Sequence, residues 1–143
     1  MKSLKLILGT VIIFISLTTC DRDNNDISFN CEKQVIISAH EYNTAPNDQL
    51  EVHKLELNED CLKISFSSSG CNGDTWVLKL IDSELILESN PPQRNLRLSL
   101  NNEELCDAYI TTEITVEISD LQVEGNKVLL NLTNSDLQIL YEY

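Results

Sequence analysis

The sequence predicts an all-β protein, an antiparallel β-sandwich or barrel of about eight or nine short strands cross-linked by disulfide bonds. Apolar and polar residues alternate through most of the chain, as in strands with one buried and one solvated face. Turn-forming residues recur between these segments. The chain also holds five cysteines, enough for two disulfides that would support a small core.

The expected strands follow one another closely along the chain. They are residues 35–40, 50–57, 62–66, 76–81, 85–87, 96–100, 114–119, 128–132 and 137–143. In the second strand the apolar positions change phase after Val52, so we expect a β-bulge near His53 and Lys54. Residues 67–70 are expected to form a turn, and residues 133–136 to join the last two strands as a hairpin.

The one helical candidate is residues 101–109. Asn102 is a suitable N-cap, and Glu103 and Glu104 would lie in the first turn. The alternative is an irregular crossover that carries Cys106 back to the sheet. Trp76 shares its alternation with the apolar positions that follow it, which favours a core position over a sugar-stacking one.

The N-terminus carries an export signal. Lys2 and Lys5 precede the apolar run 6–17, which is too short for a membrane-spanning helix of about 20 residues. Leu17-Thr18-Thr19-Cys20 then resembles the lipobox of bacterial lipoproteins. This resemblance implies removal of residues 1–19 as a signal peptide and acylation of Cys20, with several acyl chains giving stable membrane anchoring.

The resemblance, the polar composition after Cys20 and the length of the remaining chain together give the expected domain organisation. Residues 20–30 would comprise the lipidated cysteine and a polar tether, and residues 31–143 a single β-sandwich domain. The protein would be anchored at the cell outer membrane, facing either the periplasm or the cell surface. Its oligomeric state stays open.

Charge narrows the possible partners. The formal net charge is −13, and removal of Lys2 and Lys5 with the signal would make it more negative. Such a field repels phosphate backbones, which excludes nucleic acid. It favours solubility and would also attract cations or a basic partner.

With Cys20 acylated, four cysteines remain for pairing: Cys31, Cys61, Cys71 and Cys106. Three connectivities are possible. We favour Cys31–Cys61 and Cys71–Cys106, because each bond closes a loop of moderate length and the two do not cross. A zinc site is the alternative, but the closely spaced cysteine pairs typical of zinc sites are absent.

The body of the chain looks like a group of small, uncharacterised bacterial lipoproteins. The likeness lies in residues 60–64, in Ser69-Gly70-Cys71, and in residues 105–111, where a cysteine precedes Ala108-Tyr109-Ile110-Thr111. It covers about 50 residues and supports pairing Cys71 with Cys106. It implies no activity and no site residues.

The sequence offers little support for a catalytic site or a metal site. His40 and His53 lie in neighbouring expected strands and, with Glu41 or Glu51, would form the best metal site. The alternative is two partly exposed histidines on a solvated face. No nucleophile–base–acid arrangement is evident, so we expect neither an enzyme nor a cofactor or bound metal.

The remaining candidates for binding lie in loops, since loops on a rigid frame often carry contacts. They are Asn72, Gly73 and Asp74, the loop from Pro91 to Arg94, and the 43–48 loop. The leading hypothesis is a non-catalytic, lipid-anchored envelope module that binds or supports a protein or glycan partner. The alternatives are an envelope inhibitor or immunity-type protein and, less favoured, a histidine-based metal-binding protein.

Overall fold

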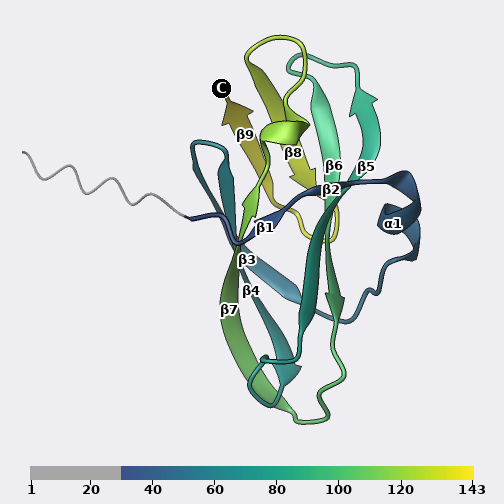
Figure 1. The fold of residues 1–143 in the computed structure, drawn as a ribbon, viewed down its shortest axis with the longest axis vertical. Coiled ribbons are helices and arrows are strands. Elements are labelled where there is room, and N and C mark those ends of the chain that lie inside the picture. Colours follow the sequence, from purple (N-terminus) through teal and green to yellow (C-terminus); the bar gives the residue numbers. More distant parts are fainter. Residues whose placement is uncertain (1–29) are drawn as a thin grey trace, which may run out of the picture.

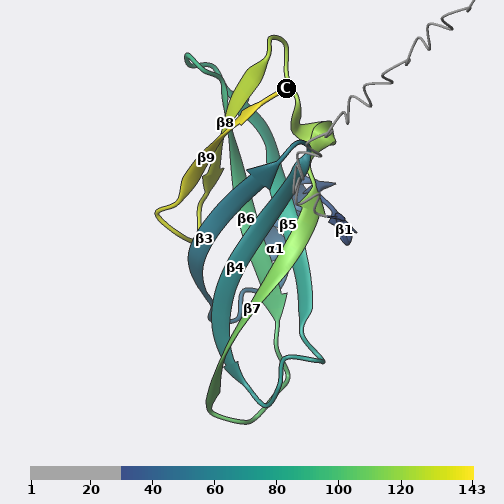
Figure 2. The same cartoon turned by 90° about the vertical axis from the view of Figure 1, so that its left-hand side faces the viewer.

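The computed structural model describes residues 30–143, which form two β-sheets in separate layers (Figure 1). The four-stranded sheet contains, in spatial order, β1 (Lys33–Gln34), β7 (Ala108–Glu117), β4 (Cys61–Gly70) and β3 (Glu51–Asn58). The five-stranded sheet contains β2 (Ile36–Ile37), β5 (Val77–Leu87), β6 (Gln93–Asn101), β8 (Lys127–Leu132) and β9 (Gln138–Glu142). The helices in this part are α1 (Ala39–Thr44) and the 3-10 turn η1 (Ser119–Leu121). Figure 2 shows β3, β4 and β7 in front of β5 and β6.

The predicted all-β sandwich is confirmed, but its sheets are mixed. The long neighbours pair antiparallel, as β4 does with both β3 and β7 and as β5 does with β6. The pairs β1–β7, β2–β5 and β6–β8 are parallel instead. Each of these strands reaches its partner by a crossover rather than by a tight hairpin, and only such a connection produces a parallel pair.

The first residues of the domain join the two layers. β1 pairs with β7 in one sheet, and β2 pairs with β5 in the other. Val35 lies between them, and its side chain is buried in the core. A disulfide connects Cys31, just before β1, to Cys61 at the start of β4. The same short segment therefore closes one side of the sandwich and is covalently attached to its centre.

The core consists of the alternating apolar side chains that the sequence predicts. Its fully buried members come from both sheets and include Ile64, Phe66, Leu98, Val116, Leu130 and Tyr141. The bulge in β3 is confirmed, because the register with β4 shifts between Val52 and Lys54. The expected terminal hairpin is confirmed as the antiparallel pair β8–β9.

Residues 39–44 are helical, so the strand expected over residues 35–40 is wrong in its second half. Ser38 is the N-cap, and its hydroxyl accepts a hydrogen bond from the Glu41 amide at 3.2 Å. No side chain of α1 is buried, so this helix gives no apolar periodicity. Its cap and its tertiary contacts hold it in place instead.

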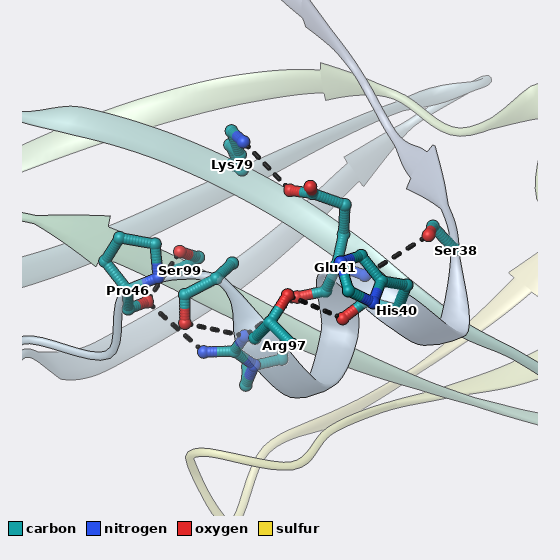
Figure 3. A network of polar contacts seen from close by, with 9 residues as sticks. Ser38, His40, Glu41, Pro46, Lys79, Arg97 and Ser99 are labelled. Atoms are coloured by element: carbon teal, nitrogen blue, oxygen red, sulfur yellow. Dashed lines mark hydrogen bonds and ion pairs between the residues drawn. The ribbon is translucent and has the colours of Figure 1, made fainter.

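Arg97 of β6 fixes the end of α1 (Figure 3). Its Nε donates to the Tyr42 carbonyl at 2.8 Å, and its Nη2 donates to the carbonyls of Glu41 and Ala45, both at 3.2 Å. Lys79 of β5 makes an ion pair with Glu41 at 2.9 Å. The guanidinium thus caps carbonyls of the last helical turn and places a positive charge at the negative end of the helix dipole.

Two further expectations about local structure are settled. Residues 67–70, expected to be a turn, continue β4 and pair with β7. Their serines bond to distant groups, since the Ser68 hydroxyl donates to the Gln49 carbonyl at 2.7 Å. Residues 102–107 contain no helix and form the irregular crossover that was the alternative.

A buried ion pair lies where β5 becomes irregular. Arg94 Nη1 donates to Asp82 Oδ1 at 2.8 Å, and the Glu84 amide donates to the same oxygen at 2.8 Å. Asp82 is fully buried and Arg94 is 7% exposed. Burial raises the pKa of Asp82, and the hydrogen bond from Glu84 and the charge of Arg94 only partly oppose this.

Within residues 30–143, no helix has the length and apolar character needed to cross a bilayer. The signal, Cys20 and nearly all of the expected 20–30 tether lie outside the described residues.

Candidate functional site

Two crossover loops meet at one end of the sandwich. Residues 71–76 connect β4 to β5, and residues 102–107 connect β6 back to β7. Gly70 lies opposite Ala108 in one sheet, and Val77 lies opposite Asn101 in the other. Both loops therefore pass between the layers at the same end, which is the lower end in Figures 1 and 2. We call these two loops the disulfide end.

The two loops are joined twice. The predicted disulfide Cys71–Cys106 is present, as is Cys31–Cys61. The carboxylate of Glu104 also reaches across to the backbone of the other loop. Its Oε2 accepts from the amides of Cys71, Asn72 and Gly73, and its Oε1 accepts from the Thr75 amide and hydroxyl. A row of amides that converges on one anion is a backbone anion-binding nest, and here the chain supplies the anion itself.

These hydrogen bonds change the acidity of Glu104. Loss of hydration alone would raise its pKa. The bonds from Gly73, Cys71, Thr75 and Asn72 outweigh that effect and lower the pKa to about 2. The side chain is therefore ionised at neutral pH, and it stays an acceptor for these amides well into the acidic range.

Two glycines allow this geometry. Gly73 has φ of +79°, a left-handed conformation that a side chain would strain. At Gly70, an added Cβ would lie 2.5 Å from Glu104 Oε2 and 2.9 Å from Trp76 Cζ2. Trp76 packs beneath the loop with its ring centroid 6.0 Å from that of Phe66, in agreement with its predicted core position.

Three of the binding candidates lie at the disulfide end. Asn72 Nδ2 donates to Asp74 Oδ2 at 2.6 Å, and the Asp74 amide donates back to Asn72 Oδ1 at 3.2 Å. Asn72 and Asp74 are exposed and Gly73 is half-buried. Arg94 lies elsewhere, buried against Asp82 near the far end of β5, so its guanidinium is not displayed on a loop.

The histidines do not form the hairpin that would have brought them together, because His40 lies on α1 and His53 on β3. His53 Nε2 lies 2.6 Å from the Ser67 hydroxyl, which in turn lies 2.7 Å from that of Thr111. Ser67 is fully buried, so its hydroxyl is not accessible to a substrate. Among residues 30–143, no three His, Cys, Asp or Glu side chains are grouped to hold a metal.

Sequence reasoning missed the role of Glu104, which it placed in the first turn of a possible helix. It also gave no role to Leu105, whose side chain is 96% exposed in the middle of the second loop. The Gly-Cys-Asn-Gly run at residues 70–73 was the available signal, because glycines flanking consecutive amides are typical of anion-binding turns. Nothing local indicates which carboxylate fills such a turn.

Replacing Glu104 with Gln should change how stability depends on pH. The folded pKa of about 2 is below the ordinary value of 4.5, so this carboxylate stabilises the fold above pH 4.5 and stops doing so as the pH falls through 2. In urea titrations from pH 6 to pH 2, the wild-type midpoint should approach that of Glu104→Gln as the pH falls. Glu103→Gln is the control, and its urea midpoint should change with pH as the wild-type midpoint does. A constant gap between wild type and Glu104→Gln would contradict the prediction.

The matches to known proteins are matches of fold to solved structures. No protein-family model matches the chain, and no curated protein matches it. A NigD-like immunity protein from Bacteroides caccae has a similar fold, with a TM-score of 0.58 and 12% identity over 78% of this chain and 59% of that one. A protein of unknown function, DUF1344, from Bacteroides vulgatus gives a TM-score of 0.52 and 18% identity over 79% of this chain and 57% of that one.

Two conclusions follow from these comparisons and the disulfides. The chain shares a fold with small Bacteroides proteins, and it spans less than three fifths of the length of either one. Two disulfides in so small a domain indicate a protein that resides outside the cytoplasm.

Proposed function

We propose that the chain is an exported binding protein of the immunity type, which recognises a positively charged protein toxin outside the cytoplasm and neutralises it. The observation that carries this proposal is the fold shared with a NigD-like immunity protein. Fold alone does not determine function, so the proposal also draws on charge and on the construction of the domain.

Charge supports a basic protein partner. The formal net charge is −13, and such a field accelerates association with a cationic protein while it repels nucleic acid. Neutralisation needs only tight binding that blocks the toxin, and no catalytic step. A rigid, disulfide-linked scaffold suits this role, because a pre-formed surface loses little conformational entropy on binding.

The proposal includes membrane anchoring through Cys20, which would place the binding domain where an incoming toxin arrives. Cys20→Ser removes the thiol that the lipid would modify. The variant should appear in the soluble fraction, whereas the wild type sediments with membranes after cell fractionation. Cys20→Ala is the matched second variant and should behave in the same way. Retention of both variants in the membrane fraction would refute acylation at this position.

The test of function is survival in co-culture. A deletion strain lacking this chain should decline at least about tenfold relative to its wild-type siblings when grown with them, because the siblings release the toxin. Expression of the full chain should restore survival. Equal competition between the two strains would overturn the proposal. The same outcome together with increased detergent sensitivity in monoculture would instead support the envelope scaffold of the alternative hypothesis.

A further inference from the structure

We infer that the crossover loop 102–107 presents Glu103, Leu105 and Asp107 as the contact surface for a basic protein partner that has an apolar pocket. This inference rests on the proposed function and names the surface that would perform it. It is built on the alternation of side chains along the loop, on how the loop is fixed, and on its charge.

Alternate residues of the loop are held by the body of the protein. The Asn102 amide donates to Asp48 Oδ2 at 2.7 Å, and Asn102 Nδ2 donates to the Ser69 carbonyl at 2.7 Å. Glu104 occupies the amide nest of the neighbouring loop, and its own amide donates to Asn102 Oδ1 at 3.0 Å. Cys106 is fixed by its disulfide with Cys71.

The residues between these attachments face solvent. Glu103, Leu105 and Asp107 are all exposed, and Leu105 is the most exposed of the large hydrophobic residues between positions 30 and 143, at 96%. A single exposed leucine needs no explanation on an ordinary surface. Here, however, the backbone on both sides of it is fixed by a disulfide and by several long-range hydrogen bonds.

The pre-formed loop gives Leu105 a specific use. A large apolar side chain that is already held in place can enter a pocket without the entropic cost of ordering a flexible loop. Burying such a side chain contributes strongly to binding when polar contacts around it exclude water. Tyr109, 62% exposed, continues the same alternation into β7 and lines a cavity of about 220 Å³ together with Glu51 and Ser69.

The negative charge around Leu105 indicates that the partner surface is basic. Residues 71–76 and 102–107 contain Asp74, Glu103, Glu104 and Asp107, and neither loop contains a lysine or an arginine. Glu104 is neutralised internally by the amides that surround it. The other three carboxylates face outward, so the complementary surface is an apolar pocket with lysines or arginines at its rim.

The experiment places a photoreactive p-benzoylphenylalanine at position 105 of the full chain in its own host, within the deletion strain described above. The control position is 85, because Leu85 is 65% exposed and lies at the opposite end of β5. Irradiation should link position 105, but not position 85, to one basic protein that mass spectrometry identifies. The purified partner is then titrated with unlabelled variants.

Leu105→Ala should weaken binding of that partner at least about tenfold, whereas Leu85→Ala should stay within about twofold. The charge-reversal variant Glu103→Lys/Asp107→Lys should bind the partner with a lower association rate, and this rate should depend less on salt concentration. Glu88→Lys/Glu124→Lys, which makes the same change in charge at exposed sites elsewhere, should have a smaller effect.

Three outcomes would overturn the inference: no adduct at position 105, an adduct with an acidic protein, or equal affinity of Leu105→Ala and wild type. If protection in co-culture persists in any of these cases, the proposed function stands and the partner binds another face. If protection is also absent, both proposals fail.

Discussion

Arg94→Met is expected to lower the free energy of unfolding by about 3–5 kcal/mol at neutral pH, because it leaves a fully buried carboxylate without its cation. Methionine fills much of the same volume, so the loss comes from the charge rather than from a cavity. Asp82 Oδ1 would keep only the Glu84 amide as a donor. The measurement is urea denaturation followed by the fluorescence of Trp76, the only tryptophan of the chain.

The pH dependence of this variant identifies the cause. Burial already raises the pKa of Asp82 in the folded protein, and removal of Arg94 raises it further. The folded state then binds a proton more readily than the unfolded state, so stability increases as the pH falls toward the ordinary value of 3.8. The deficit of Arg94→Met should therefore shrink on acidification.

The control is Asp82→Leu/Arg94→Met, which removes both charges together. Replacing a buried ion pair by apolar residues is often neutral or stabilising, so the double variant should recover most of the lost stability. A double variant as unstable as Arg94→Met, with no effect of pH on either, would show that the ion pair is not the source of the loss.

Removing the Cys31–Cys61 disulfide is expected to cost about 3–4 kcal/mol, since this bond closes a loop with a sequence separation of 30. The variant is Cys31→Ala/Cys61→Ala, compared with wild type by urea denaturation under non-reducing conditions. The matched control is Cys71→Ala/Cys106→Ala, whose bond spans a similar separation of 35.

The two disulfide variants should lose similar amounts of stability but differ in local exposure. Without Cys31–Cys61, the short strands β1 and β2 lose their covalent attachment and keep their short parallel pairings with β7 and β5 and the burial of Val35. Limited proteolysis should then cut near Lys33 first. Without Cys71–Cys106, cleavage should move to the disulfide end. The same first cleavage site in both variants would contradict this local effect.

The sandwich could be predicted because each long strand has one face in the core. Leu96, Leu98 and Leu100 are all essentially fully buried, and their polar neighbours point away from the core. The bulge at Val52 could be predicted from the same alternation, because an extra residue shifts the apolar positions of the strand by one. The disulfide pairing followed from loop lengths, and the structure confirms it.

The errors occur where non-local contacts determine the local structure. Ser38 and Glu41 have the spacing of a helix N-cap signal, but α1 has only six residues and buries none of them. Its C-terminus depends on Arg97, more than 50 residues away in sequence. Residues 67–70 resemble a turn in composition, but their backbone pairs with β7, and two of their hydroxyls bond to Thr111 and to the Gln49 carbonyl.

The candidate site was only partly predictable for a related reason. Asn72, Gly73 and Asp74 attract attention because their composition is that of a loop. The group that organises this loop, Glu104, is about 30 residues away, and only the disulfide hints that the two segments meet. Neither alternation nor motif spacing assigns a carboxylate to a set of backbone amides.

The Cys31–Cys61 bond also decides how the domain responds to mechanical load. Tension applied through the chain before Cys31 passes by covalent bonds to Cys61 at the head of β4, an interior strand of its sheet. β1 and β2 are bypassed, so they are not peeled away one hydrogen bond at a time. Unfolding by pulling from this side would instead require β4 to shear along both β3 and β7 at once.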